Sequence, residues 1–130
     1  MLITEYIPFI RSQFQSIKEE YKMDWDTDSN QYLITLSNEK VLIKFFTERR
    51  EEDIGIILRN KKINEFYYDL PSLKGFDNFN EGLTDIEISE VETFTDDIKA
   101  TVFLFRTFFE KYCQDMLSGD FSQVGPGLPN

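Results

Sequence analysis

Histidine is absent from this sequence of 130 residues, and Cys113 is its single cysteine. Without histidine the chain cannot form a Ser-His-Asp triad, a Cys–His pair or a histidine-containing metal site. One cysteine cannot form an intrachain disulfide or an iron–sulfur site, and this usage is typical of the reducing cytosol. We expect Cys113 to be a small buried hydrophobic residue of a C-terminal helix and not a reactive thiol.

Phosphate-binding glycine motifs are also absent. The sequence contains neither a P-loop nor a G-x-G-x-x-G motif, and the Gly-Pro-Gly of residues 125–127 is not followed by a helical pattern. No spacing of carboxylates singles out a catalytic pair. We therefore expect no cofactor and no metal, and we predict that the protein is not an enzyme.

Basic residues are few: 14 lysines and arginines stand against 24 acidic residues, which gives a net charge of −10 and a pI near 4.4. Such a chain repels nucleic-acid phosphates and anionic membrane surfaces, so we expect neither as a partner. Its field attracts basic proteins, although negative charge also serves solubility alone.

Long apolar runs are missing as well. No run approaches the roughly 18 residues of a membrane span. The N-terminal residues 1–14 carry no basic segment before their apolar residues, so they do not resemble a signal peptide. These absences predict a cytoplasmic protein.

Aromatic residues, in contrast, are plentiful, with thirteen phenylalanines among them. Disordered chains are poor in aromatics, so this composition indicates a packed protein. We predict a single domain over residues 1–130, with a flexible Gly/Pro-rich tail over about 122–130.

Two helices are predicted from apolar residues at steps of three and four. The first covers about residues 3–22, with Pro8 either at its start or at a kink. The second begins near Thr93, which forms an acidic variant of a capping box with Asp96, and ends at Gly119. Its apolar stripe contains Ile98, Val102, Phe105, Phe109, Tyr112 and Met116.

Between the helices, apolar residues alternate over residues 32–37, 41–47 and 54–59, which predicts an antiparallel β-meander. Residues 63–69 are a possible fourth strand, residues 70–82 are expected to be a loop, and residues 84–89 are a possible short strand. The predicted fold is α+β: an N-terminal helix, a meander of three to four strands and a long C-terminal helix, packed as two layers.

A calcium loop is suggested by oxygen-bearing side chains at alternate positions from Asp24 to Asn30. The loop lacks the glycine that an EF-hand needs, because Ser29 stands there. It also lacks the bidentate glutamate, because Thr35 stands at the twelfth position. We favour a solvated loop.

The strongest charge asymmetry lies in residues 75–98, which hold eight acidic residues and no lysine or arginine. Asp96 and Asp97 suit the N-terminus of the long helix, and the other six, including Asp77 and Glu81, are either solvated or part of a docking surface. We predict a partner-binding surface formed by Asp85, Glu87, Glu90 and Glu92.

The segment KYCQDMLSGDFS, residues 111–122, closes the long apolar helix with a Gly-Asp-Phe-Ser turn. In this segment, in size and in charge, the chain resembles small acidic bacterial proteins of unknown function, some of them suspected immunity proteins of polymorphic toxin systems. That resemblance implies a non-enzymatic protein that binds and neutralises a toxin. It identifies no catalytic residue in this sequence. The turn also has a structural explanation, since Gly119 ends a helix and Phe121 can fold back on its last turn.

Three functions follow from these patterns. The first is a cytosolic protein-binding domain, and its specific form is an immunity protein that neutralises a basic toxin through the acidic surface. The second is a structural or adaptor subunit, or a homodimer, that uses the mixed sheet face with Leu33, Leu42, Phe46 and Ile57. The third is an enzyme with carboxylate or tyrosine chemistry, which no sequence feature supports.

Overall fold

The computed structural model describes residues 2–26, 30–47, 53–62, 66–69, 82–122 and 128–129. The chain forms an α+β fold whose elements are η1 (Ile3–Tyr6), α1 (Ile7–Gln13), α2 (Gln15–Glu20), β1 (Asp24–Trp25), β2 (Leu33–Ser37), β3 (Val41–Thr47), β4 (Ile54–Asn60), β5 (Phe66–Asp69), α3 (Asp85–Glu92), α4 (Asp97–Tyr112), α5 (Gln114–Leu117) and β6 (Leu128–Pro129).

The strands are antiparallel and lie in the order β1-β2-β3-β4-β5-β6. The predicted meander is present as β2, β3 and β4, and β5 is its fourth strand. Two short strands that the sequence patterns did not predict, β1 and β6, form the edges of the sheet. One of them, β6, comes from the predicted tail and pairs Leu128 with Tyr67, whereas residues 123–127 and 130 lie outside the described part.

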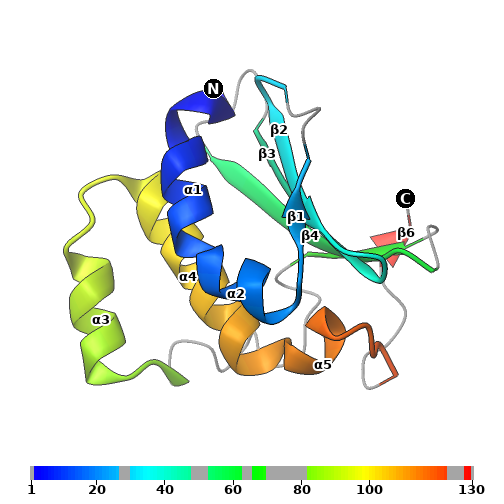
Figure 1. The fold of residues 1–130 in the computed structure, drawn as a ribbon. Coiled ribbons are helices and arrows are strands. Elements are labelled where there is room, and N and C mark those ends of the chain that lie inside the picture. Colours follow the sequence, from blue (N-terminus) through cyan, green and yellow to red (C-terminus); the bar gives the residue numbers. More distant parts are fainter. Residues whose placement is uncertain are drawn as a thin grey trace.

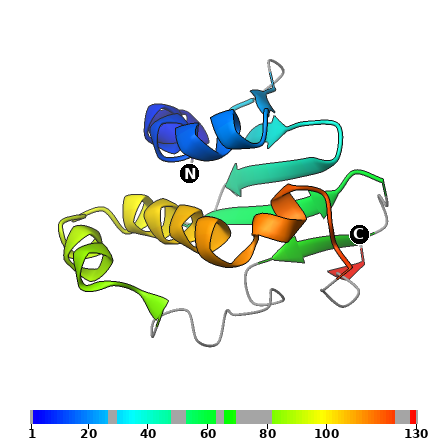
Figure 2. The ribbon, with the colours of Figure 1, turned by 60° about the horizontal axis from the view of Figure 1, so that its bottom comes forward.

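The helices α1, α2, α4 and α5 gather on one face of the sheet, as Figures 1 and 2 show. Ile10, Phe14 and Ile17 of the N-terminal segment are fully buried there, as are Ile34, Leu36, Ile43, Phe45 and Leu58 of the strands. Phe14 contacts Phe45 edge to face, with 4.8 Å between ring centroids. This contact joins the helical layer to the sheet, which is the two-layer packing that the apolar stripes predict.

The predicted helix over residues 3–22 is divided into three pieces. Pro8 is the second residue of α1, where its missing N–H is harmless, and residues 3–6 form a tight 3-10 turn before it. A second break falls at Phe14, whose backbone departs from helical geometry. Even so, Lys18 N–H still bonds to the Phe14 carbonyl at 2.9 Å, so α2 continues the same buried stripe.

The long helix α4 begins at Asp97 with Asp96 as its N-cap. Thr93, which the sequence pattern placed at this start, instead ends α3. Ile98, Val102 and Phe109 of the predicted stripe are buried, but Tyr112 is exposed and Phe105 is half-buried. Buried Phe103 and Phe108 widen the stripe, and the Phe103 ring packs against Phe94.

The short strand predicted over residues 84–89 is wrong, because residues 85–92 form the helix α3. Ile86 and Ile88 alternate with polar residues as in a strand, but no strand among the described residues lies alongside to pair with them. Thr84 and Glu87 form a reciprocal capping box instead, and this local arrangement starts a helix. Figures 1 and 2 show α3 beside α4 and away from the sheet.

The opposite face of the sheet carries the mixed side chains. Ile57 and Thr35 are buried there, while Leu33, Leu42 and Phe46 are half-buried. The Phe46 ring lies over Gly55, at a place where any side chain on residue 55 would overlap it. Lys44 covers the ring with its ammonium 5.4 Å from the centroid. This face therefore exposes little apolar surface.

Candidate functional site

Two places on the described surface combine unusual charge and exposure: the helix α3 and a hollow beside the end of α2. The acidic residues Asp85, Glu87, Glu90 and Glu92 all lie on α3, while Asp77 and Glu81 lie outside the described residues. The structure therefore brings the four predicted site residues onto one short helix.

Glu87 holds α3 to the rest of the protein. Its backbone N–H donates to Thr84 Oγ1 at 3.2 Å, and its Oε1 accepts from the Thr84 N–H at 2.8 Å. The same carboxylate forms an ion pair with Lys111 of α4, with 2.6 Å between Nζ and Oε1. Lys111 also donates to the Gly82 carbonyl at 2.6 Å. Glu87 thus faces inward and positions α3.

The pKa of Glu87 reflects this position. Partial burial acts to raise the pKa of the carboxyl, but hydrogen bonds from Lys111 and Thr84 outweigh that effect and leave the pKa below its ordinary value. Glu87 is therefore a charged structural residue at neutral pH.

The other side of α3 points to solvent. We call it the α3 face and define it by Asp85, Ile86, Ile88, Glu90 and Glu92. The three acids are exposed, and none of them has an ion-pair partner among the described residues. Ile86 is 79% exposed and Ile88 39%. α3 buries none of its own side chains, so this face is a free mixed surface.

Asp96 does not belong to that surface. It caps α4 through the N–H groups of Ile98 and Lys99, at 2.8 and 3.4 Å, and its Oδ2 accepts from the Tyr6 hydroxyl at 3.0 Å. These are structural contacts, as the sequence pattern suggested for this residue.

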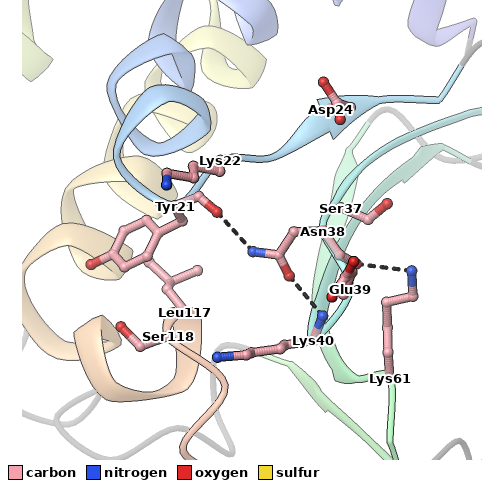
Figure 3. A pocket seen from close by; sticks show the side chains of 10 residues that line it. All are labelled: Tyr21, Lys22, Asp24, Ser37, Asn38, Glu39, Lys40, Lys61, Leu117 and Ser118. Carbon is pink, nitrogen blue, oxygen red and sulfur yellow. Dashed lines mark hydrogen bonds between the residues drawn. The ribbon is translucent and has the colours of Figure 1, made fainter.

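The hollow has a volume of about 740 Å³ and lies between the end of α2, the β2–β3 turn, the end of β4 and the end of α5. Figure 3 shows its lining side chains, which are Tyr21, Lys22, Asp24, Ser37, Asn38, Glu39, Lys40, Lys61, Leu117 and Ser118. Three lysines against two acids give this place a local positive excess within an acidic protein.

Asn38 is the centre of the hollow's hydrogen bonding. Its side-chain amide donates to the Tyr21 carbonyl at 2.9 Å, and its Oδ1 accepts from the N–H groups of Lys40 and Val41. Lys61 Nζ donates to the Asn38 carbonyl at 2.9 Å. Asn38 therefore ties α2, the β2–β3 turn and β4 together.

Sequence patterns missed this hollow. Its lysines come from three separate segments, and the sequence indicated only turns and a mixed surface there. Lys22 carries the single local signal, a positive φ of 52°, and that signal exists only in the structure.

The remaining sequence candidates do not form a site within the described residues. They contain no group of three or more His, Cys, Asp or Glu side chains placed to hold a metal ion. In the suggested calcium loop, residues 27–29 are not described, Asp26 Oδ2 accepts from the Thr35 hydroxyl and Asn30 Oδ1 accepts from the Tyr32 N–H. Cys113 is buried as predicted, and burial raises the pKa of its thiol to about 12, so it stays protonated.

Within the same described residues, no helix has the length and apolar character needed to cross a membrane. No protein-family model, curated protein or solved structure matches this chain, so the α3 face and the hollow are assessed from their own geometry.

Proposed function

We propose that this chain is a non-enzymatic, cytoplasmic protein-binding domain that binds a basic protein through the α3 face. An immunity protein that neutralises a basic toxin is the specific role that fits this proposal best. The observation that carries it is the α3 face itself: a helix that Glu87 links to α4 and that exposes one isoleucine strongly among three exposed acids.

The first support is that the α3 face breaks two local rules of stability. Glu90 and Glu92 lie in the last turn of α3, where the helix dipole disfavours negative charge, and no basic residue accompanies them. Ile86 leaves a large apolar side chain 79% exposed to water. Functional surfaces are where such local conflicts are expected.

The second support is the match between this face and a basic partner. Burying a fully exposed isoleucine in an interface contributes about 1.5–3 kcal/mol, so Ile86 could act as an apolar anchor. The surrounding carboxylates would add about 0.2–1 kcal/mol each and would mainly accelerate association. The net charge of −10 acts in the same direction over a longer distance.

The sheet face is the weaker alternative for an adaptor or homodimer. Its apolar residues are buried or half-buried, and Lys44 already covers Phe46. A partner seated there would gain little new apolar contact, so we keep this alternative as an outcome of the experiment.

The test is affinity capture from the native lysate at low and high salt, with the wild-type protein and two variants as baits. The α3 variant carries Asp85→Asn, Ile86→Ser, Glu90→Gln and Glu92→Gln, and it leaves Glu87 in place. The control carries Glu5→Gln, Glu20→Gln and Asp115→Asn, which neutralises three exposed acids elsewhere.

We expect a basic protein that the wild type and the control retain at low salt, that salt elutes, and that the α3 variant loses. With the purified partner, the α3 variant should raise Kd by at least about tenfold and the control by less than about threefold. Equal binding by all three baits, or no captured protein, would reject the α3 face. Salt-insensitive self-capture would favour the sheet face.

A further inference from the structure

The hollow beside α2 is separate from the α3 face, and its lining shares no residue with it. Its lining includes Lys22, Lys40 and Lys61, which come from three elements that are distant in sequence. Figure 3 shows the ammonium groups of Lys22 and Lys40 on different sides of the hollow. The chain has ten more acidic than basic residues, so a local excess of positive charge is unusual in it.

The backbone at Lys22 is the first observation. Lys22 follows α2 in the left-handed conformation, and the Met23 N–H bonds back to the Lys18 carbonyl at 2.9 Å. This helix end favours glycine, because a Cβ atom is strained there. Gly119 has the corresponding place after α5, with a φ of 93°. The chain thus uses glycine at one rim of the hollow and a strained lysine at the other.

The second observation is that two of the three ammonium groups are available. Lys61 is held by the Asn38 carbonyl, but Lys22 and Lys40 have no ion-pair partner in the described part of the chain. Figure 3 shows the Lys40 side chain extending from the β2–β3 turn towards Leu117 and Ser118, and Asp24 pointing away from Lys40. Asp24 therefore does not neutralise Lys40, and neither Lys22 nor Lys40 belongs to an ion pair among the described residues.

The third observation is that the site is already formed. The hydrogen bonds of Asn38 fix the turn that carries Lys40 against the end of α2, where Lys22 lies. A site whose backbone is fixed before binding loses less entropy when a ligand arrives. The volume of about 740 Å³ is within the usual range for small-molecule sites and far exceeds a single phosphate ion.

We propose that this hollow binds a small organic molecule that carries a phosphate or carboxylate group. Lys40 and the Ser118 hydroxyl bind the anionic group, Lys22 attracts it from the other side of the hollow, and the half-buried Tyr21 ring contacts the organic part. All of these except Tyr21 are exposed, so binding weakens as salt screens the lysines.

A competing explanation is that the lysines only balance the carbonyl ends of α2 and α5, which also point to this region. Those helices have six and four residues, and the turns after them already use their carbonyls in backbone hydrogen bonds. The two explanations predict different behaviour of Lys22→Gly. Dipole balance predicts a loss of stability, whereas an anion site predicts a loss of binding at unchanged or greater stability.

The experiment is an NMR titration of backbone amides in the full chain at constant ionic strength, with inorganic pyrophosphate and succinate as separate probes. Saturable shifts at Lys22, Lys40 and Ser118 with pyrophosphate alone would support the site and assign a phosphate ligand. The same shifts with succinate alone would support it and assign a carboxylate ligand.

Variants show whether the lysines bind the anion. Lys40→Gln and Lys22→Gly should each raise Kd about fivefold, the effect of one exposed charge contact. Lys62→Gln removes an exposed lysine that does not line the hollow and should change Kd by less than about twofold. A parallel urea titration should find Lys22→Gly at least as stable as the wild type.

Two results would overturn the proposal. One is the absence of saturable shifts at about 50 mM of either anion, a concentration that fills even a millimolar site. The other is an equal loss of binding in Lys62→Gln and Lys40→Gln, which would mean diffuse attraction to surface charge.

Discussion

Asp96 fixes the beginning of α4 and joins it to the N-terminal segment through the Tyr6 hydroxyl. We expect Asp96→Ala to lower the free energy of unfolding by about 1–2 kcal/mol, because the variant loses both a helix cap and this long-range hydrogen bond. Urea denaturation at pH 7 measures the change. Asp97→Ala, at the exposed next position, is the control and should cost less than about 0.5 kcal/mol.

The pH dependence of this difference follows from the pKa of Asp96. Partial burial acts to raise that pKa, but hydrogen bonds from Tyr6 and from the Ile98 and Lys99 N–H groups leave it below the ordinary value of 3.8. A lowered pKa means that the stabilisation is fully present above pH 3.8 and is lost as pH falls through the folded-state value. The difference in free energy of unfolding between the wild type and Asp96→Ala should therefore become smaller in acid. If this difference persists there, the negative charge of Asp96 does not contribute to the cap.

Single residues also show where sequence reasoning was sufficient. The burial of Cys113 and the left-handed turn at Gly119 were predictable, because both depend on one residue type in a clear helical pattern. The choice between Thr93 and Asp96 as cap was not, because each residue type suits an N-cap. The long-range bond from Tyr6 to Asp96 is a tertiary contact that no local pattern contains.

At the level of elements, α3 depends on few contacts with the rest of the protein. It buries none of its own side chains, and Lys111 links it to α4 through Glu87 and the Gly82 carbonyl. We expect Lys111→Met to raise hydrogen-exchange rates in α3 about tenfold, while those of α4 stay within about twofold. The global free energy of unfolding should fall by about 1 kcal/mol or less, since this ion pair is partly exposed.

Glu90→Gln is the matched control for this prediction, because Glu90 lies on the same helix and is exposed. Its exchange rates should equal those of the wild type or be slower. If Lys111→Met leaves α3 exchange unchanged, then the capping box alone holds the helix.

The elements differ in how well their sequences predict them. The meander was predictable because alternation in residues 32–37, 41–47 and 54–59 matches a buried sheet face. The same alternation at Ile86 and Ile88 gave the wrong element, since period two is a sheet signal only where another strand can pair. The capping box at Thr84 and Glu87 was the local signal that the strand interpretation overlooked.

At the scale of the whole molecule, the acidic surface was predictable and the hollow was not. Charge counts along residues 75–98 already identify an asymmetric segment. The hollow requires the ends of α2, β4 and α5 to meet the β2–β3 turn, and that meeting depends on the packing of both layers. The role of Glu87 within the acidic segment was also not predictable from sequence. Its structural role depends on an ion pair with Lys111, which is distant in sequence.

Net charge also affects the stability of the whole fold. With a net charge of −10, repulsion among carboxylates should exceed attraction, even though ion pairs such as Arg106–Glu110 and Glu87–Lys111 are present. Raising ionic strength from about 0.01 to 0.1 M shortens the screening length from about 30 to 10 Å. We expect the free energy of unfolding to rise over this range, as measured by urea denaturation in NaCl.

A charge series makes this prediction specific. Glu90→Gln with Glu92→Gln changes the net charge from −10 to −8, because two acids are lost, and Lys62→Gln changes it to −11. The rise in free energy of unfolding with salt should be smallest for the variant with net charge −8 and largest for the variant with net charge −11. The −8 variant should also be more stable than the wild type at low salt, because it removes two acids that oppose the α3 dipole. If the wild type proves more stable, the two glutamates contribute to folding, and their exposed position would no longer point to a partner.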